Sequence, residues 1–186
     1  MTPVTEFNLS IFELLHGLAG RSPFLDFTVV SIAQYAAYLA LIIFVVGIVR
    51  MRADWRMRVA IFAHAALAVI LARGIVTEGI RFFFPSVRPF LTLGFEPLLT
   101  ETSNAFPSGH AAVFFALATT LFFYDRKKGW WFLAFALING IARVIAGVHW
   151  PVDIVGGVLV GVLGGVVIRI LLKPHLDKLQ GIVVKS

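Results

Sequence analysis

The stretch NAFPSGHAAVFFALATTLFF, residues 104–123, places a proline, a serine, a glycine and a histidine directly before an almost wholly apolar run. Proline is common at a helix start, and such a run is typical of a helix inside a membrane. The stretch therefore predicts a helix over 108–124 whose N-terminal end is polar. Taken alone, PSGH is most often a helix cap, and His110 most often a packed histidine.

The composition of the rest of the chain agrees with a membrane protein. Of its 186 residues, 59% are hydrophobic and 14% are charged, whereas soluble domains carry about 25% charged residues. The length allows five or six spans and no additional soluble domain, so we expect a single membrane-embedded domain over 1–186. The lack of cysteine excludes disulfides and thiol catalysis.

Five apolar runs predict transmembrane helices, and a sixth run is shorter. The five lie at 25–49, 59–84, 108–124, about 130–146, and 152–172. The sixth, 7–19, contains Glu13 and His16 and predicts an interfacial helix or a short sixth helix. Prolines mark 85–107 as a loop. The expected fold is all-α, a polytopic membrane helix bundle.

The basic residues predict which side of the membrane each loop occupies. They cluster at 50–58, at 126–128 and in the tail from 173, and five spans place all three segments on one side. By the positive-inside rule that side is the cytoplasm, which explains the net charge of +6 without a nucleic-acid partner. The loop 85–107 and the turn 147–152 then lie together on the outer side.

That outer side collects polar residues from four segments of the chain. The set is Arg81, Arg88, Ser108, Gly109, His110, Arg143, His149 and Asp153. Clustered arginines repel one another unless they share an anion, and guanidinium groups suit phosphate oxygens. A helix start with a serine and a glycine offers further donors to an anion.

His149 and Asp153 form the second half of this candidate site. They are four residues apart, with Pro151 between them as a helix start. A carboxylate bonded to one ring nitrogen fixes the tautomer and leaves the other nitrogen free as a nucleophile. The pair alone could be incidental, but its arrival beside His110 and three arginines favours a phosphate-processing site.

These residues resemble the three-part signature of the type-2 phosphatidic acid phosphatase superfamily, K-x6-R-P, then P-S-G-H, then S-R-x5-H-x3-D. Residues 81–89 match the first part with Arg81 in place of lysine, residues 107–110 match the second fully, and residues 142–153 match the third with Ala142 in place of serine.

The resemblance implies a mechanism without a metal or a cofactor. His149 would attack phosphorus, Asp153 would orient it, and His110 would protonate the leaving oxygen. The phosphoryl oxygens would be held by Arg81, Arg88, Ser108, Gly109 and Arg143. Arginine at 81 keeps the charge but changes its geometry, and Ala142 lacks one hydroxyl.

Within the superfamily, residues 12–26 resemble the small bacterial undecaprenyl-diphosphate phosphatases of the bacitracin-resistance type. This implies a multi-pass protein of the bacterial cytoplasmic (inner) membrane, with the bilayer and a lipid phosphate as partners and a site facing outward. Phosphatidylglycerophosphate, phosphatidic acid and lipid A phosphates are alternative substrates. A non-catalytic anion-binding membrane protein is the alternative from another class, and the oligomeric state stays open.

The sequence also gives smaller expectations. Gly157, Gly161 and Gly165 recur every four residues and predict close helix packing. His64 is expected in the core, and Glu78 is expected to pair with Arg73 or to orient Arg81. The outer-loop residues Glu96, Glu101 and Asn104 are expected to be solvated, and the tail 175–186 to lie on the cytoplasmic surface.

Overall fold

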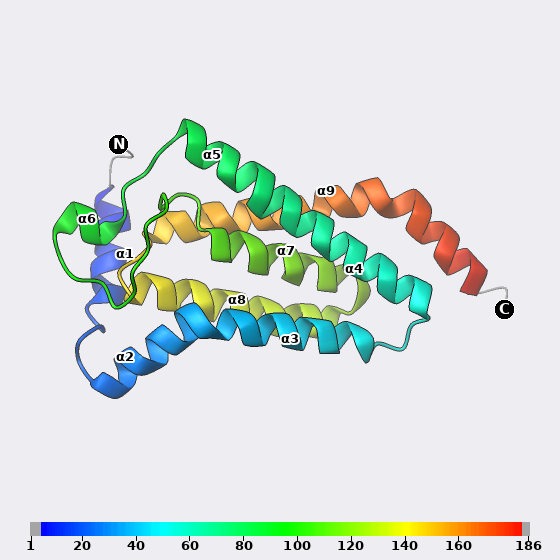
Figure 1. The fold of residues 1–186 in the computed structure, drawn as a ribbon, viewed down its shortest axis with the longest axis horizontal. Helices are drawn as coiled ribbons and strands as arrows, with labels where there is room; N and C mark the ends of the chain where they lie inside the picture. The colour runs from blue at the N-terminus through cyan, green and yellow to red at the C-terminus, as the bar shows by residue number, and fades with distance from the viewer. Residues whose placement is uncertain (1–4, 184–186) are drawn as a thin grey trace.

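The computed structural model describes the backbone of residues 5–183 and the side chains of 5–177. Helices joined by loops are the only regular elements of the described chain (Figure 1). Its elements are α1 (Glu6–His16), α2 (Pro23–Val30), η1 (Ser31–Tyr35), α3 (Ala36–Val49), α4 (Trp55–Val69), η2 (Ile70–Thr77), α5 (Glu78–Phe83), α6 (Pro89–Leu93), α7 (Gly109–Tyr124), α8 (Arg126–Ile145) and α9 (Pro151–Val183), where η marks a π-helical segment.

Four helices of the described chain are long and apolar enough to cross a membrane. They are Pro23–Val49 and Trp55–Phe83, each continuous through its π-helical segment, and Arg126–Ile145 and Pro151–Asp177. The fifth expected span, α7, has 16 residues and rises about 24 Å. It packs between α8 and α9, with α4 beside it. The predicted all-α membrane bundle is therefore confirmed.

Glycines of α9 explain how closely α7 and α9 pack. A Cβ built on Gly157 would lie 2.5 Å from the carbonyl oxygen of Ser108, and one on Gly161 would lie 2.5 Å from that of Ala112. On Gly165 it would meet the Thr119 side chain at 2.8 Å. Any larger side chain would separate the two backbones. The predicted packing role of these glycines is confirmed.

Helix α1 crosses the end of the bundle instead of running along it (Figure 1). Its 11 residues are too few to span a bilayer. The Asn8 Oδ1 accepts a hydrogen bond from the Val152 amide at 3.1 Å, and the Phe12 ring packs 5.0 Å from that of Trp150. This arrangement supports the interfacial alternative predicted for 7–19.

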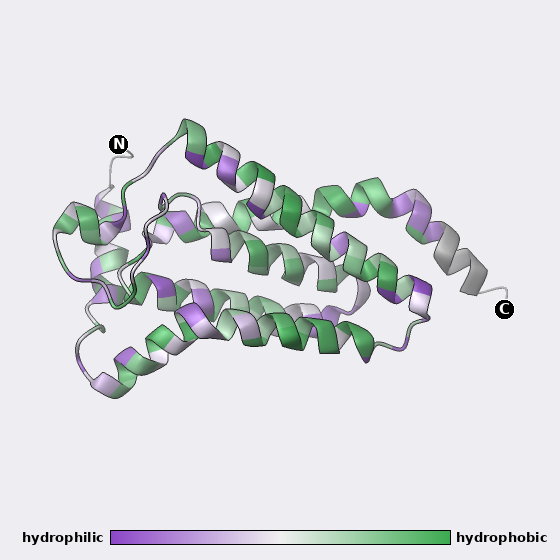
Figure 2. Cartoon of the chain, in the orientation of Figure 1, coloured by the Kyte–Doolittle hydropathy of each residue, from purple (hydrophilic) through white to green (hydrophobic). Residues whose placement is uncertain are grey.

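The polar segments separate to the two ends of the bundle, and apolar residues dominate between them (Figure 2). The α3–α4 and α7–α8 junctions, which carry two of the basic segments, lie at the end opposite α1, α6 and the start of α7 (Figure 1). This is the relative arrangement predicted from the five spans.

Two helix boundaries differ from the sequence prediction. The loop 85–107 contains the short helix α6, and α9 continues to Val183 instead of ending near 172. Pro174 lies inside α9 and bends the helix without ending it, since a proline removes only one backbone donor. The predicted surface tail is therefore helical up to Val183. Residues 184–186 lie outside the described residues.

His64 is fully buried, as predicted. Its Nε2 lies 2.9 Å from the Gly165 carbonyl oxygen, and its Nδ1 lies 3.1 Å from the Tyr124 hydroxyl. Both ring nitrogens are satisfied, so the residue links α4, α7 and α9 in the core.

Candidate functional site

The predicted site residues gather at the end of the bundle that carries α1. Arg81 lies in the last turn of α5, Arg88 precedes α6, Ser108 is the N-cap of α7, and Arg143 lies in the last turn of α8. His149 lies in the α8–α9 turn and Asp153 in the first turn of α9. The end of α5, the residue before α6, the start of α7, the end of α8 and the start of α9 thus contribute to one polar cluster.

His149 and Asp153 contact each other as their spacing predicts. The Asp153 Oδ2 lies 3.3 Å from His149 Nδ1 and accepts a hydrogen bond of 2.8 Å from the Trp150 amide. Both side chains are almost inaccessible to solvent. A carboxylate beside Nδ1 favours the tautomer that has the proton on Nδ1 and the lone pair on Nε2.

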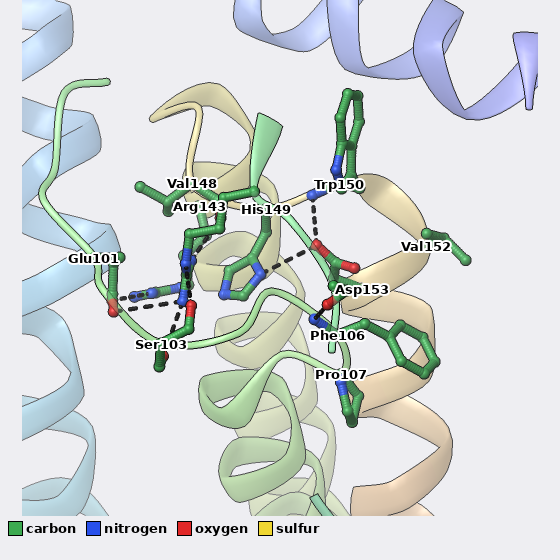
Figure 3. Close-up of polar contacts among 12 residues, drawn as sticks. Glu101, Ser103, Phe106, Pro107, Arg143, Val148, His149, Trp150, Val152 and Asp153 are labelled. Atoms are coloured by element: carbon green, nitrogen blue, oxygen red, sulfur yellow. Dashed lines mark hydrogen bonds and ion pairs between the residues drawn. The ribbon is translucent and has the colours of Figure 1, made fainter. Parts of the chain in front are cut away.

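The other ring nitrogen of His149 is free. Its Nε2 is buried and has no hydrogen-bond partner among the described residues. Figure 3 shows the imidazole between Asp153 on one side and Arg143 with Glu101 on the other. Burial, followed by the positive charges of Arg143 and Arg88, lowers the pKa of His149 well below 6.5. A neutral imidazole with an available lone pair is the state a nucleophile requires.

The start of α7 is fixed directly to α9. The Ser108 amide donates to the Asp153 carbonyl oxygen at 2.9 Å. The Ser108 hydroxyl is fully buried, and it too lacks a partner within the described chain. A buried hydroxyl without a protein partner can donate a hydrogen bond to an anion at the start of the helix.

Arg88 and Arg143 are both buried and held by backbone carbonyls. Arg88 donates from Nη1 to the Val148 oxygen at 2.6 Å and from Nε to the Ser103 oxygen at 2.7 Å. Arg143 donates from Nη1 to the Ala33 oxygen at 3.0 Å. Burial lowers the pKa of Arg88 to about 10, so Arg88 stays charged at neutral pH.

Arg81 is held at the other edge of the cluster. Its Nη2 donates to the Pro107 oxygen at 3.0 Å, and its Nη1 lies 3.3 Å from the Glu78 carboxylate. The same Glu78 oxygen pairs with Arg73. Both pairings expected for Glu78 are therefore present.

Glu101 is placed differently from the sequence prediction. Its carboxylate forms an ion pair with Arg143 and lies 3.6 Å from the Arg88 Nη2. Burial would raise the pKa of Glu101, but the two guanidinium groups lower it below its ordinary value. The prediction of a solvated Glu101 is wrong because two buried cations need a nearby anion.

The prediction of solvated side chains fails for Asn104 and holds for Glu96. Asn104 is also not simply solvated, since its Nδ2 donates to the Arg81 carbonyl oxygen at 3.1 Å. Glu96 is exposed, as predicted. Clustered arginines need a nearby anion, and this could have indicated that an acidic residue of the loop pairs with them. The positions of Glu96 and Glu101 in the sequence could not show which of the two does so.

His110 lies in the first turn of α7 beside the arginines. Together with Glu101 and Arg143 it lines a cavity of about 270 Å³. Its ring packs 6.2 Å from that of Phe114. The cavity gives His110 access to a group held by the arginines, which is what a proton donor needs.

Sequence comparison identifies the family to which this constellation belongs. The profile of the PAP2 superfamily matches residues 62–175, which include all three parts of the signature. The chain belongs to the PAP2 superfamily. Its expected resemblance to the phosphatidic acid phosphatases is thereby confirmed.

Known relatives of the PAP2 chain cover most of its length. It is 32% identical over 162 residues to a Bacillus licheniformis protein named bacitracin transport permease protein BcrC, covering 86% of the chain and 77% of the relative. It is 30% identical over 178 residues to the undecaprenyl-diphosphatase BcrC of Bacillus subtilis, covering 91% and 88%. The crystal structure of Aquifex aeolicus LpxE superposes with a TM-score of 0.71 at 26% identity, covering 87% of this chain and 94% of that one.

Proposed function

We propose that this PAP2 protein is a membrane lipid phosphatase that acts through a phosphohistidine. The observation that carries the proposal is the free Nε2 of His149. It is buried, without a partner in the described structure, and lies on the side of the ring toward Arg143, while Asp153 contacts the opposite nitrogen. A site that only bound an anion would need the arginines but no oriented nucleophile.

The proposed reaction has two steps. The Nε2 lone pair of His149 forms a bond to phosphorus, and the bond from phosphorus to the leaving oxygen breaks as His110 gives that oxygen a proton. A water molecule, deprotonated by His110, then attacks phosphorus, and the nitrogen–phosphorus bond breaks to restore Nε2. Asp153 holds the Nδ1–H throughout and stabilises the positive ring of the intermediate.

The remaining residues of the cluster bind the phosphoryl oxygens. Arg81, Arg88 and Arg143 supply fixed positive charge, and the Ser108 hydroxyl and the backbone at Gly109 supply further donors. The guanidinium groups are already held by carbonyl oxygens, so little reorganisation is needed when charge develops in the transition state. Gly109 begins α7, where backbone amides are without helical partners.

The proposed substrate is undecaprenyl diphosphate, with the site on the outer side of the bacterial inner membrane. The name of the Bacillus subtilis relative supports the substrate. The separation of the basic junctions from the site supports the outward orientation. Phosphatidylglycerophosphate, phosphatidic acid and lipid A phosphates remain the competing substrates for the same chemistry.

Purified protein in detergent tests the mechanism. We expect phosphate release from undecaprenyl diphosphate in the presence of EDTA, and a phosphoenzyme that is labile in acid and stable in alkali when the reaction is quenched early. His149→Ala should abolish both signals, whereas His175→Ala, an exposed histidine of α9, should retain both. Loss of wild-type activity in EDTA, or turnover by His149→Ala, would exclude the mechanism. Phosphatidylglycerophosphate and phosphatidic acid assayed in parallel test the substrate.

A further inference from the structure

Arg73 is a cation of the bundle that the signature does not include. It lies in η2, within the helix Trp55–Phe83, where ionisable residues are costly and usually serve a function. Its side chain reaches the start of α7. A Cβ built on Gly109 would lie 2.5 Å from the Arg73 Nε and 3.0 Å from its Cδ. The guanidinium group is therefore packed against the PSGH segment.

A crevice begins at this contact and extends along the bundle. It has a volume of about 260 Å³, with Arg73, Gly109 and His110 at its polar part and apolar residues of α3 and α7, including Leu41 and Leu117, along the rest. The helices α3 and α4 share few contacts beside it. An acyl or isoprenoid chain is the kind of group that such an apolar wall accommodates.

His110 separates this crevice from the arginine cluster. It lines the crevice together with Arg73, and it lines the neighbouring cavity together with Arg143 and Glu101. Ala37 and Tyr38 border both spaces, so the two are adjacent. A substrate phosphate held by the arginines would have its leaving group next to His110, and the crevice lies on the far side of that residue.

We propose that Arg73 binds the lipid-proximal phosphate of a diphosphate substrate, as the specificity-determining residue of a leaving-group subsite. The inference rests on the proposed function. When a lipid diphosphate is cleaved, the leaving group is a lipid monophosphate that carries negative charge beside His110. A monophosphate lipid instead releases an uncharged alcohol, which has no need of a guanidinium group at that place.

The contacts of Arg73 leave it able to bind an anion. Its Nη1 pairs with Glu78, and within the described chain its Nε and Nη2 make no hydrogen bond. Glu78 also contacts Arg81, so one carboxylate aligns a residue of the phosphate cluster with the residue of the crevice. Two planar donors facing a phosphate are the usual arrangement in which arginine binds one.

Ligands that share one lipid tail test the assignment. We expect Arg73→Gln to lower kcat/KM for farnesyl diphosphate roughly 10- to 100-fold, the loss typical of one charge-assisted hydrogen bond. The inhibition constant of farnesyl methylenediphosphonate should rise by a similar factor. That of farnesyl phosphonate, which lacks the second phosphate, should rise much less. Arg73→Lys should recover part of the difference, because it restores the charge without the planar donors.

The controls separate this assignment from a structural role. Arg21→Gln removes an exposed arginine bonded only to the Gly17 carbonyl oxygen within the described chain, and it should leave both inhibition constants unchanged. The role of Arg73 would be overturned if the wild-type enzyme is active and Arg73→Gln raises the inhibition constants of the two phosphonates equally. It would also be overturned if the substitution changes neither constant. Absence of phosphate release by the wild type would instead contradict the proposed function. If Arg73→Gln fails to fold, Arg73→Lys carries the same comparison.

Discussion

Replacing Glu101 with glutamine should make the free enzyme bind phosphate mimics more tightly. The Glu101 carboxylate pairs with Arg143 and lies 3.6 Å from Arg88, two of the groups proposed to bind phosphoryl oxygens. A bound anion must therefore compete with a carboxylate that is already present. Glutamine keeps the size of the side chain but removes its charge.

The size of the effect follows from the burial of the pair. A hydrogen bond between charged groups contributes about 1.5–3 kcal/mol when buried, and an exposed pair about 0–1 kcal/mol. The Glu101 side chain is 27% exposed, whereas both arginines are 2% exposed. We therefore take an intermediate value, about 1–1.4 kcal/mol, for the interaction of Glu101 with the arginines. Its loss corresponds to roughly 5- to 10-fold tighter binding of a phosphate mimic.

Competitive inhibition by orthovanadate measures this change. The inhibition constant for Glu101→Gln should fall 5- to 10-fold, and Glu96→Gln, an exposed carboxylate of the same loop, should leave it unchanged. Because its pKa is lowered, Glu101 stays charged above its ordinary pKa and loses the pairing only as pH falls through the lower, folded-state value. The difference should therefore be constant between about pH 6 and 8. An unchanged or raised inhibition constant in Glu101→Gln would refute the competition.

Two further predictions concern protonation and packing. Since the pKa of His149 is lowered well below 6.5, its imidazole should keep the ¹⁵N shifts of a neutral ring as pH falls from 8 to about 6, assigned by comparison with His149→Ala; protonation near 6.5 would contradict the burial argument. Gly161→Ala should lower the free energy of unfolding by about 1–3 kcal/mol, because its Cβ would meet the Ala112 carbonyl oxygen at 2.5 Å. Thermal unfolding should show no such loss for Gly79→Ala, where nothing lies within 4 Å.

The helices and the gathering of the site could be predicted from the sequence because both depend on local composition. An apolar run long enough to span a bilayer has few alternatives to a helix. Once the basic segments at 50–58 and 126–128 share one side, the chain must bring residues 81, 110 and 149 to the other. The spacing of His149 and Asp153 adds a contact that the turn leading into α9 supplies.

The details that could not be predicted depend on contacts between distant segments. Glu101 is anchored by Arg143, 42 residues later. No local sequence pattern indicates that these two residues pair. The place of Arg73 depends on the closeness of η2 and α7 at Gly109. The continuation of α9 past Pro174 required knowing that a helix can bend there and go on.

The position of α1 has a consequence for biosynthesis. Helix α1 is synthesised before the residues that it contacts: His16 Nδ1 lies 2.8 Å from the Ile145 carbonyl oxygen, 129 positions later, and the Asn8 Oδ1 accepts a hydrogen bond from the Val152 amide, 144 positions later. Until α8 and α9 are synthesised, α1 lacks these two hydrogen-bond partners. Chains that end before the α8–α9 turn therefore lose together the proposed nucleophile His149 and the Val152 amide that holds Asn8 of α1.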